Sequence, residues 1–231
     1  MMDAALIEAR GLDKTFGSAP ILRGVNLAVR PATAAMVIGR NGAGKSTLVR
    51  ILAGLSAPTA GEALLFGAPS RTLEPAARRR FALVTHQSFL YPNLSARENL
   101  EFYADLYRVA EARAEIPRWL ERVGLASAAD TRVRTFSRGM EQRLTLARAM
   151  LARPDVLLMD EPFAALDADG VALVAALLRE ALARRCAVLL TAHQPLAIDG
   201  LKFELYEIER GRLLALAGAA GGAYPRALQA G

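Results

Sequence analysis

Residues 39–47 read GRNGAGKST, which fits the pattern G-x-x-x-x-G-K-[ST]. In this pattern the glycines let successive backbone N–H groups turn toward one anion. The stretch follows the apolar run AAMVIG at 34–39 and opens a helical pattern at 45–53, which is the context that its chemistry requires. We therefore predict a phosphate-binding loop made of Gly39, Arg40, Asn41, Gly42, Ala43, Gly44, Lys45, Ser46 and Thr47.

Such a loop binds the phosphates of a nucleoside triphosphate together with Mg²⁺. Lys45 is placed to reach the β- and γ-phosphates, and the Ser46 hydroxyl to take one position on the metal. A pair of acidic residues elsewhere in the chain supports this prediction. The apolar run VLLMD at 156–160 ends in Asp160 and is followed by Glu161. Asp160 is predicted to hold Mg²⁺ and Glu161 to act as the general base for the attacking water.

The loop lies in an alternating pattern of strands and helices. Four apolar runs lack period-2 alternation and are typical of a parallel sheet covered on both faces. They span 34–39, 81–85, 156–160 and 187–192, and helical patterns at 45–53, 141–151 and 170–183 separate them. This order predicts a wound α/β core.

Further segments are predicted to lie outside that core. Residues 5–29 alternate polar and apolar and predict antiparallel strands, and residues 203–216 predict a hairpin that turns at Gly211. Residues 88–138 are predicted to form a small inserted helical subdomain, with a capping box from Ser95 to Glu98. One helix carries Leu100, Tyr103 and Tyr107 on one face, and a second lies around Trp119, Leu120 and Val123 and ends at Gly124.

Composition restricts the setting of the protein. The chain has 231 residues with a net charge of +6, and its basic residues are scattered as in a general arginine-rich bias. The lone Cys186 excludes an internal disulfide and opens a buried run. Asp3 and Glu8 interrupt the opening, so no secretory signal is expected there, and the run 213–225 is too short to cross a bilayer.

A second anion site is predicted at residues 134–150, RTFSRGMEQRLTLARAM. A turn over 136–139 leads directly into an amphipathic helix, where unpaired backbone N–H groups and the helix dipole favour an anion. The phosphate-binding loop already accounts for one nucleotide, so this second site calls for another ligand.

With these motifs the chain resembles the nucleotide-binding subunit of an ATP-binding-cassette transporter, over about residues 5 to 216. The family's signature turn falls on Phe136-Ser137-Arg138-Gly139-Met140, in which Arg138 and Met140 depart from the usual residues. The resemblance further implies that Gln87 is the glutamine-loop residue and Mg²⁺ ligand, that Asp167 belongs to the D-loop, and that His193 is the switch histidine. Phe16 falls where the family stacks an aromatic ring on adenine. His86 is interpreted as structural.

The resemblance implies a P-loop fold of ABC type, with a mixed sheet, an antiparallel β subdomain and the helical insertion. It implies one nucleotide-binding domain over residues 1–217, followed by a low-complexity tail over 218–231. Two copies of such a subunit pair head to tail, and Ser137 and Gly139 of one copy then bind the ATP held by the other. Integral membrane subunits are the other expected partners, at the cytoplasmic face of the membrane, and no nucleic acid is expected.

The segments around 86–109, 136–151 and 160–167 are similar to the ATPase subunit of the haem exporter of cytochrome c maturation. Haem export is therefore expected. Two alternatives remain open, namely another small exporter of drug, polysaccharide or lipid type and a soluble ATPase of this superfamily that acts on ribosomes or nucleic acid. The second is disfavoured by the single cassette and the short span between Gln87 and Ser137.

Overall fold

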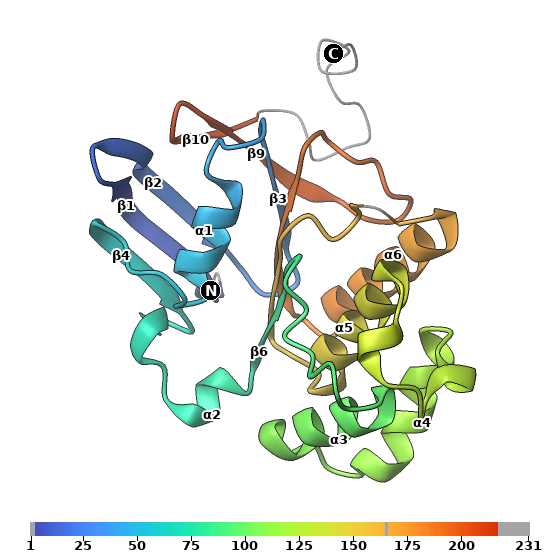
Figure 1. Cartoon of the computed structure of the whole chain (residues 1–231). Helices are drawn as coiled ribbons and strands as arrows, with labels where there is room; N and C mark the ends of the chain where they lie inside the picture. Colours follow the sequence, from blue (N-terminus) through green and yellow to red (C-terminus); the bar gives the residue numbers. More distant parts are fainter. Residues whose placement is uncertain (1–2, 165, 217–231) are drawn as a thin grey trace.

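The computed structural model describes residues 3–164 and 166–216. These residues form two β-sheets with helices around them (Figure 1). The tail predicted over 218–231 lies outside the described residues. Within them, no helix is long and apolar enough to cross a membrane.

A six-stranded sheet forms the centre of the fold, in the order β10-β9-β3-β8-β7-β6. The four predicted apolar runs are confirmed as parallel strands: β3 (Ala34–Ile38), β6 (Phe81–Val84), β7 (Val156–Met159) and β8 (Ala187–Ala192). Every residue of β3, β7 and β8 is buried, because both faces of a parallel sheet are covered. The thiol of Cys186, directly before β8, is also buried, which raises its pKa to about 12.

The predicted hairpin forms, but its expected place outside the core sheet is wrong. Its strands are β9 (Phe203–Glu209) and β10 (Arg212–Ala215), which pair antiparallel with each other. β9 also pairs parallel with β3, with Met36 opposite Leu205, so the hairpin extends the core sheet. The alternating pattern reported only the local hairpin, because it carries no information about which sheet edge the first strand joins.

The second sheet is antiparallel and has the order β2-β1-β4-β5. β1 (Ile7–Phe16) and β2 (Ala19–Val29) confirm the strands predicted over 5–29, whereas β4 (Ala60–Leu65) and β5 (Ala68–Pro69) were not predicted. One buried cluster joins this sheet to the core sheet, with Leu12, Leu48 and Val37 among its members. Figure 1 shows helix α1 (Lys45–Leu52) between the two sheets.

The segment predicted to be helical contains α3 (Ala96–Tyr107) and α4 (Ala112–Arg122), followed by the short turns η2 (Ala126–Ala128) and η3 (Val133–Thr135). The capping box of Ser95 and Glu98 is confirmed at the start of α3. Leu100 and Leu120 belong to the same buried cluster as Leu144 and Met159, so this segment shares its core with the central sheet.

Three other α-helices lie in the described part of the chain. α2 (Pro75–Arg78) is a single turn before β6, and α5 (Arg138–Leu151) and α6 (Ala168–Ala183) lie where helices were predicted. α5 begins at Arg138, three residues before the predicted start at Glu141, because the Ser137 hydroxyl caps the helix by accepting a hydrogen bond from the Met140 N–H at 3.2 Å.

Candidate functional site

The site lies at the carboxyl edge of the central sheet. The loop ending at Lys45 follows β3, His193 follows β8, and Asp160 and Glu161 follow β7. Because β8 lies between β3 and β7, these three strand ends are neighbours and bring Lys45, Glu161 and His193 together. Ligands of open α/β sheets bind at this edge, outside the carboxyl ends of the strands.

The loop before α1 can approach an anion closely because of its glycines. Gly44 has a φ of 111°, in a region that side chains rarely adopt, and it leads directly into α1. A Cβ atom at Gly39 would lie 2.9 Å from the backbone oxygen of Ile208 in β9, so only glycine fits there. Among the described residues no side chain caps the start of α1, which leaves its backbone N–H groups available to an anion.

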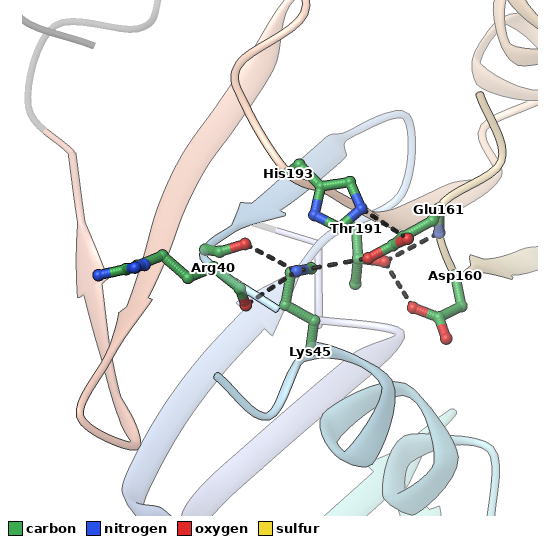
Figure 2. Close-up of polar contacts among 7 residues, drawn as sticks. Arg40, Lys45, Asp160, Glu161, Thr191 and His193 are labelled. Atoms are coloured by element: carbon green, nitrogen blue, oxygen red, sulfur yellow. Dashed lines mark hydrogen bonds and ion pairs between the residues drawn. The ribbon is translucent and has the colours of Figure 1, made fainter. Parts of the chain in front are cut away.

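Lys45 is buried and its ammonium group is held inside the loop. Its Nζ atom donates to the Gly39 oxygen at 2.7 Å and the Arg40 oxygen at 3.2 Å, and it lies 3.4 Å from Glu161 Oε1. Figure 2 shows that the Arg40 side chain points away from this cluster. Arg40 therefore contributes its carbonyl group to the position of Lys45.

Glu161 connects the ammonium group of Lys45 to His193. Its Oε2 atom lies 3.0 Å from His193 Nε2, and its backbone has a φ of 52°. A positive φ is uncommon for a residue other than glycine, and such strain persists where the surrounding structure fixes it. Here the Glu161 N–H donates to the Thr191 hydroxyl at 2.9 Å, which fixes this turn and directs the carboxylate toward Lys45.

Thr191 bonds to two of the predicted site residues, and the sequence analysis did not assign it a role. It is fully buried near the end of β8, and its hydroxyl donates to Asp160 Oδ1 at 2.7 Å while it accepts from Glu161. One hydroxyl therefore positions both acidic residues (Figure 2). The available signal was a hydroxyl in the apolar run at 187–192, two residues before His193.

A hollow of about 310 Å³ lies over the phosphate-binding loop. It is lined by residues of the loop and by three residues from other segments: Ile21, Phe16 and Glu161. The ring of Phe16 is 55% exposed, and the ammonium group of Lys14 lies 4.7 Å from its centroid. An exposed ring beside a phosphate site offers a stacking surface to a base.

The other predicted site residues do not line this hollow. His193 borders a neighbouring hollow of about 200 Å³ that shares Glu161. Gln87 is exposed in the segment after β6, where its N–H donates to the Thr85 hydroxyl at 3.2 Å. Ser137 is exposed at the start of α5, and Asp167 caps α6 by accepting from the Gly170 N–H at 2.8 Å.

Three of the predicted site residues carry side chains that suit a Mg²⁺ ion. Ser46 offers a hydroxyl oxygen, Asp160 a carboxylate and Gln87 an amide oxygen, and hard oxygen donors of this kind are the ligands that Mg²⁺ prefers. Asp160 is buried beside Thr191, so its carboxylate is restrained before any metal binds.

Together, a glycine loop that opens a helix, a buried lysine and two acidic residues after a neighbouring strand define a P-loop nucleotide hydrolase. Residues 22–164 match the family described as "ABC transporter", and the chain belongs to this family. It is an ATP-binding subunit of an ABC transporter, and its P-loop fold of ABC type is confirmed.

The chain is also similar to individual ATP-binding proteins in sequence and in structure. The chain is 39% identical to the Nod factor export ATP-binding protein I of Paraburkholderia xenovorans, over 93% of this chain and 71% of that protein. A protein of the same name from Burkholderia thailandensis is 38% identical over the same shares. A solved structure of an ATP-binding subunit of an ABC transporter is 27% identical, with a TM-score of 0.84 over 94% of this chain and 95% of that one.

A dimeric ATP-binding cassette in a post-hydrolysis state, bound to ADP and Pi, is also similar. It is 25% identical, with a TM-score of 0.76 over 92% of this chain and 99% of that chain.

Proposed function

We propose that this chain hydrolyses ATP to drive an exporter, from the cytoplasmic face of the membrane and bound to integral membrane subunits. The contact of Lys45 with Glu161 carries the proposal, because it joins a phosphate-binding cation to a general base within one chain. The relatives named for export support the direction of transport. We take residues 1–217 as one nucleotide-binding domain, with the helical subdomain over about 88–138.

In this proposal the loop residues 39–47 hold the phosphates of ATP. Lys45 donates to β- and γ-phosphate oxygens, and the backbone N–H groups at the start of α1 donate to the others. Phe16 stacks on the adenine ring. Ser46, Asp160 and Gln87 hold Mg²⁺, which when bound neutralises charge on the β- and γ-phosphate oxygens.

Glu161 accepts a proton from the water whose oxygen attacks the γ-phosphorus, while the bond from that phosphorus to the bridging oxygen of ADP breaks. His193 donates to the γ-phosphate, and its 3.0 Å contact with Glu161 positions the base. Thr191 keeps both carboxylates in place through its two hydrogen bonds.

We propose that Ser137 and Gly139 contact a nucleotide that is bound in the phosphate-binding loop of a second copy of the chain. Ser137 is exposed, and a Cβ atom at Gly139 would meet nothing closer than the Ser137 hydroxyl at 4.0 Å. The packing of the chain itself therefore leaves room for a side chain at position 139 and does not explain why glycine stands there. A phosphate bound to another subunit, approaching the backbone at this position, would explain the glycine. The dimeric structure with ADP and Pi supports this arrangement.

Asp167 contributes differently in this proposal. Its carboxylate caps α6 and lies 3.4 Å from Arg143 in α5. We propose that Asp167 sets the conformation of the D-loop that faces the second copy. Asp167 would then affect the nucleotide indirectly, through the position of this loop, and would not contact the nucleotide itself.

Replacing Ser137 with arginine is expected to prevent ATP-dependent dimerisation and to leave ATP binding by the single chain unchanged. The bulky cation would occupy the space of the partner's phosphate, and at least about tenfold more protein would be needed to form the dimer. Light scattering with and without Mg·ATP measures the dimer, and a fluorescent ATP analogue measures binding.

The Ser137→Ala variant is the matched control for this experiment. It also loses the helix cap, at about 1 kcal/mol, but adds no bulk, so it should dimerise far better than the arginine variant. Loss of ATP binding by the single arginine variant would show that the turn belongs to its own subunit's site.

For the cargo we propose only the class of transporter, which is a small exporter. The relatives named for Nod factor export favour another exporter over the expected haem exporter, and they give haem export no support. Haem export remains the second candidate on the motif similarity around 86–109 and 136–151.

Purification of the full chain with its membrane partner, followed by an absorbance spectrum, separates the two cargo candidates. A Soret band in stoichiometric amount would establish haem as the cargo. Its absence, with ATPase activity stimulated by another exported molecule, would remove the haem candidate. Failure to co-purify with any membrane protein, combined with salt-sensitive binding to nucleic acid, would contradict the exporter proposal itself.

A further inference from the structure

Arg148 is a buried arginine to which the proposed mechanism assigns no role. It lies in α5 and is only 5% exposed, and its Nε atom has no hydrogen-bond partner within the part of the chain that the structure describes. A buried charge is costly unless its surroundings compensate it. The contacts that the guanidinium group of Arg148 makes must therefore offset the cost of burying its charge, and they indicate what the residue does.

Those contacts lie on both sides of Gln87. One guanidinium nitrogen of Arg148 donates to the Leu83 oxygen in β6 at 2.7 Å, and the guanidinium carbon lies 5.9 Å from the ring centroid of Phe89. A single side chain therefore contacts the chain four residues before Gln87 and two residues after it. β6 and α5 lie side by side, so the contact joins the central sheet to α5 (Figure 1).

Tyr103 of α3 completes this arrangement. The Arg148 guanidinium carbon lies 5.0 Å from the Tyr103 ring centroid, within cation–π range, and the Tyr103 hydroxyl donates to the Phe89 oxygen. Burial raises the pKa of Tyr103, although the nearby Arg148 acts to lower it, so the hydroxyl keeps its proton at neutral pH and can donate. Phe89 itself has a φ of 56°, a conformation that needs such restraint.

Two more hydrogen bonds restrain the residues next to Gln87. The Ser88 hydroxyl donates to Glu141 Oε1 at 2.5 Å, and the Thr85 hydroxyl donates to the backbone carbonyl oxygen of Gln87 at 2.9 Å. Glu141 and Arg148 are seven residues apart, two turns along the same face of α5. That face of α5 therefore contacts the chain on both sides of Gln87, at Leu83, Ser88 and Phe89.

We infer that Arg148 is a positioning residue, whose guanidinium group fixes the segment between Leu83 and Phe89 and so sets the position of the Gln87 amide at the Mg²⁺ site. The inference rests on the proposed function, because the role of Gln87 as a metal ligand is part of that proposal. Since Ser137 caps the start of α5, the same helix links the turn that meets the second copy to the glutamine of its own site.

The test is a double-mutant cycle in the full-length protein, with the variants Gln87→Ala, Arg148→Lys and the two combined. Lysine keeps the charge but loses the planar group that bonds to Leu83 and stacks on two rings. Arg148→Lys alone should lower kcat about tenfold, because small displacements of positioned groups have effects of at least this order, and should raise the Mg²⁺ concentration for half-maximal activity. Binding of a fluorescent ATP analogue without Mg²⁺ should not change.

In the Gln87→Ala background, Arg148→Lys should have no further effect on kcat or on the Mg²⁺ requirement. Effects that multiply instead would overturn the inference and leave a purely structural arginine. If Gln87→Ala alone changes neither quantity, the proposed metal role of Gln87 fails first, which is a distinguishable result.

Two further variants keep the test interpretable. Arg153→Lys alters an exposed arginine that follows the same helix and pairs with Glu115, and it should match the unmodified protein. If Arg148→Lys does not fold, Tyr103→Phe removes only the hydroxyl bond to Phe89 and enters the same cycle. Additivity of Tyr103→Phe with Gln87→Ala would then count against the inference.

Discussion

A glutamine in place of Glu161 is expected to lower the ATPase rate about a thousandfold, within the range for loss of a general base. The amide cannot accept the proton of the attacking water. It has nearly the same shape as the carboxylate and can still accept a hydrogen bond from Lys45, so ATP should bind normally. Phosphate release measures turnover, and a fluorescent analogue measures binding.

The same variant should accumulate as a dimer when Mg·ATP is present. If ATP joins the two copies, the dimer persists until hydrolysis, and a chain that cannot hydrolyse remains paired. Size-exclusion chromatography with light scattering should show a doubled mass with Mg·ATP and the single mass after nucleotide is removed.

Glu62→Gln is the control for the loss of one negative charge, since Glu62 is exposed on β4 in the antiparallel sheet. It should turn over as the unmodified protein does. Normal turnover by the Glu161 variant would remove this residue as the base and assign the proton to another group.

Lys45→Ala is expected to weaken ATP binding about tenfold to a hundredfold, which is the usual effect of losing a hydrogen bond to a charged group. The ammonium group is the only lysine donor on the hollow over the loop, among the residues that the structure describes. Isothermal titration with ATP and Mg²⁺ gives the affinity directly.

The alanine variant should also be less stable without nucleotide. Lys45 is only 4% exposed and donates to the Gly39 and Arg40 oxygens, so its removal leaves these acceptors without that donor at a cost of about 1–3 kcal/mol. Thermal unfolding should therefore show a lower Tm, and saturating ATP should raise that Tm less than in the unmodified protein.

Lys202→Ala removes an exposed lysine at the other end of the central sheet and serves as the charge control. It should bind ATP normally. Undiminished ATP affinity in the Lys45 variant would contradict the assignment of residues 39–47 as the phosphate-binding loop.

Most elements that position the site could be predicted, because each carries a local pattern. The buried strands before Lys45 and Asp160 are uniformly apolar, and the loop between β3 and α1 has a glycine spacing that few other structures need. Ser95 was recognisable as a helix start from its capping-box spacing, whereas the helix after Ser137 was predicted to begin only at Glu141. The short strands β4 and β5 carry no comparable pattern and were missed.

Thr191 escaped prediction because its role depends on a neighbouring strand. A threonine inside an apolar run is ordinary in sequence, and only the pairing of β8 with β7 brings its hydroxyl to Asp160 and to the Glu161 N–H. The positive φ of Glu161 could not be predicted from the local sequence Asp-Glu-Pro either, since none of these residues requires a left-handed backbone conformation.

The sequence by itself determined the chemistry of this protein, because its glycine spacing, one lysine and two adjacent carboxylates are the groups that a nucleotide phosphate site uses. Only the tertiary structure decided the strand order β3-β8-β7, the addition of β9 to that sheet and the contacts of Arg148 around Gln87. The physical reason is that side-chain patterns report the burial of each segment. The choice of a strand's neighbour depends on packing and hydrogen bonds between residues far apart in the chain.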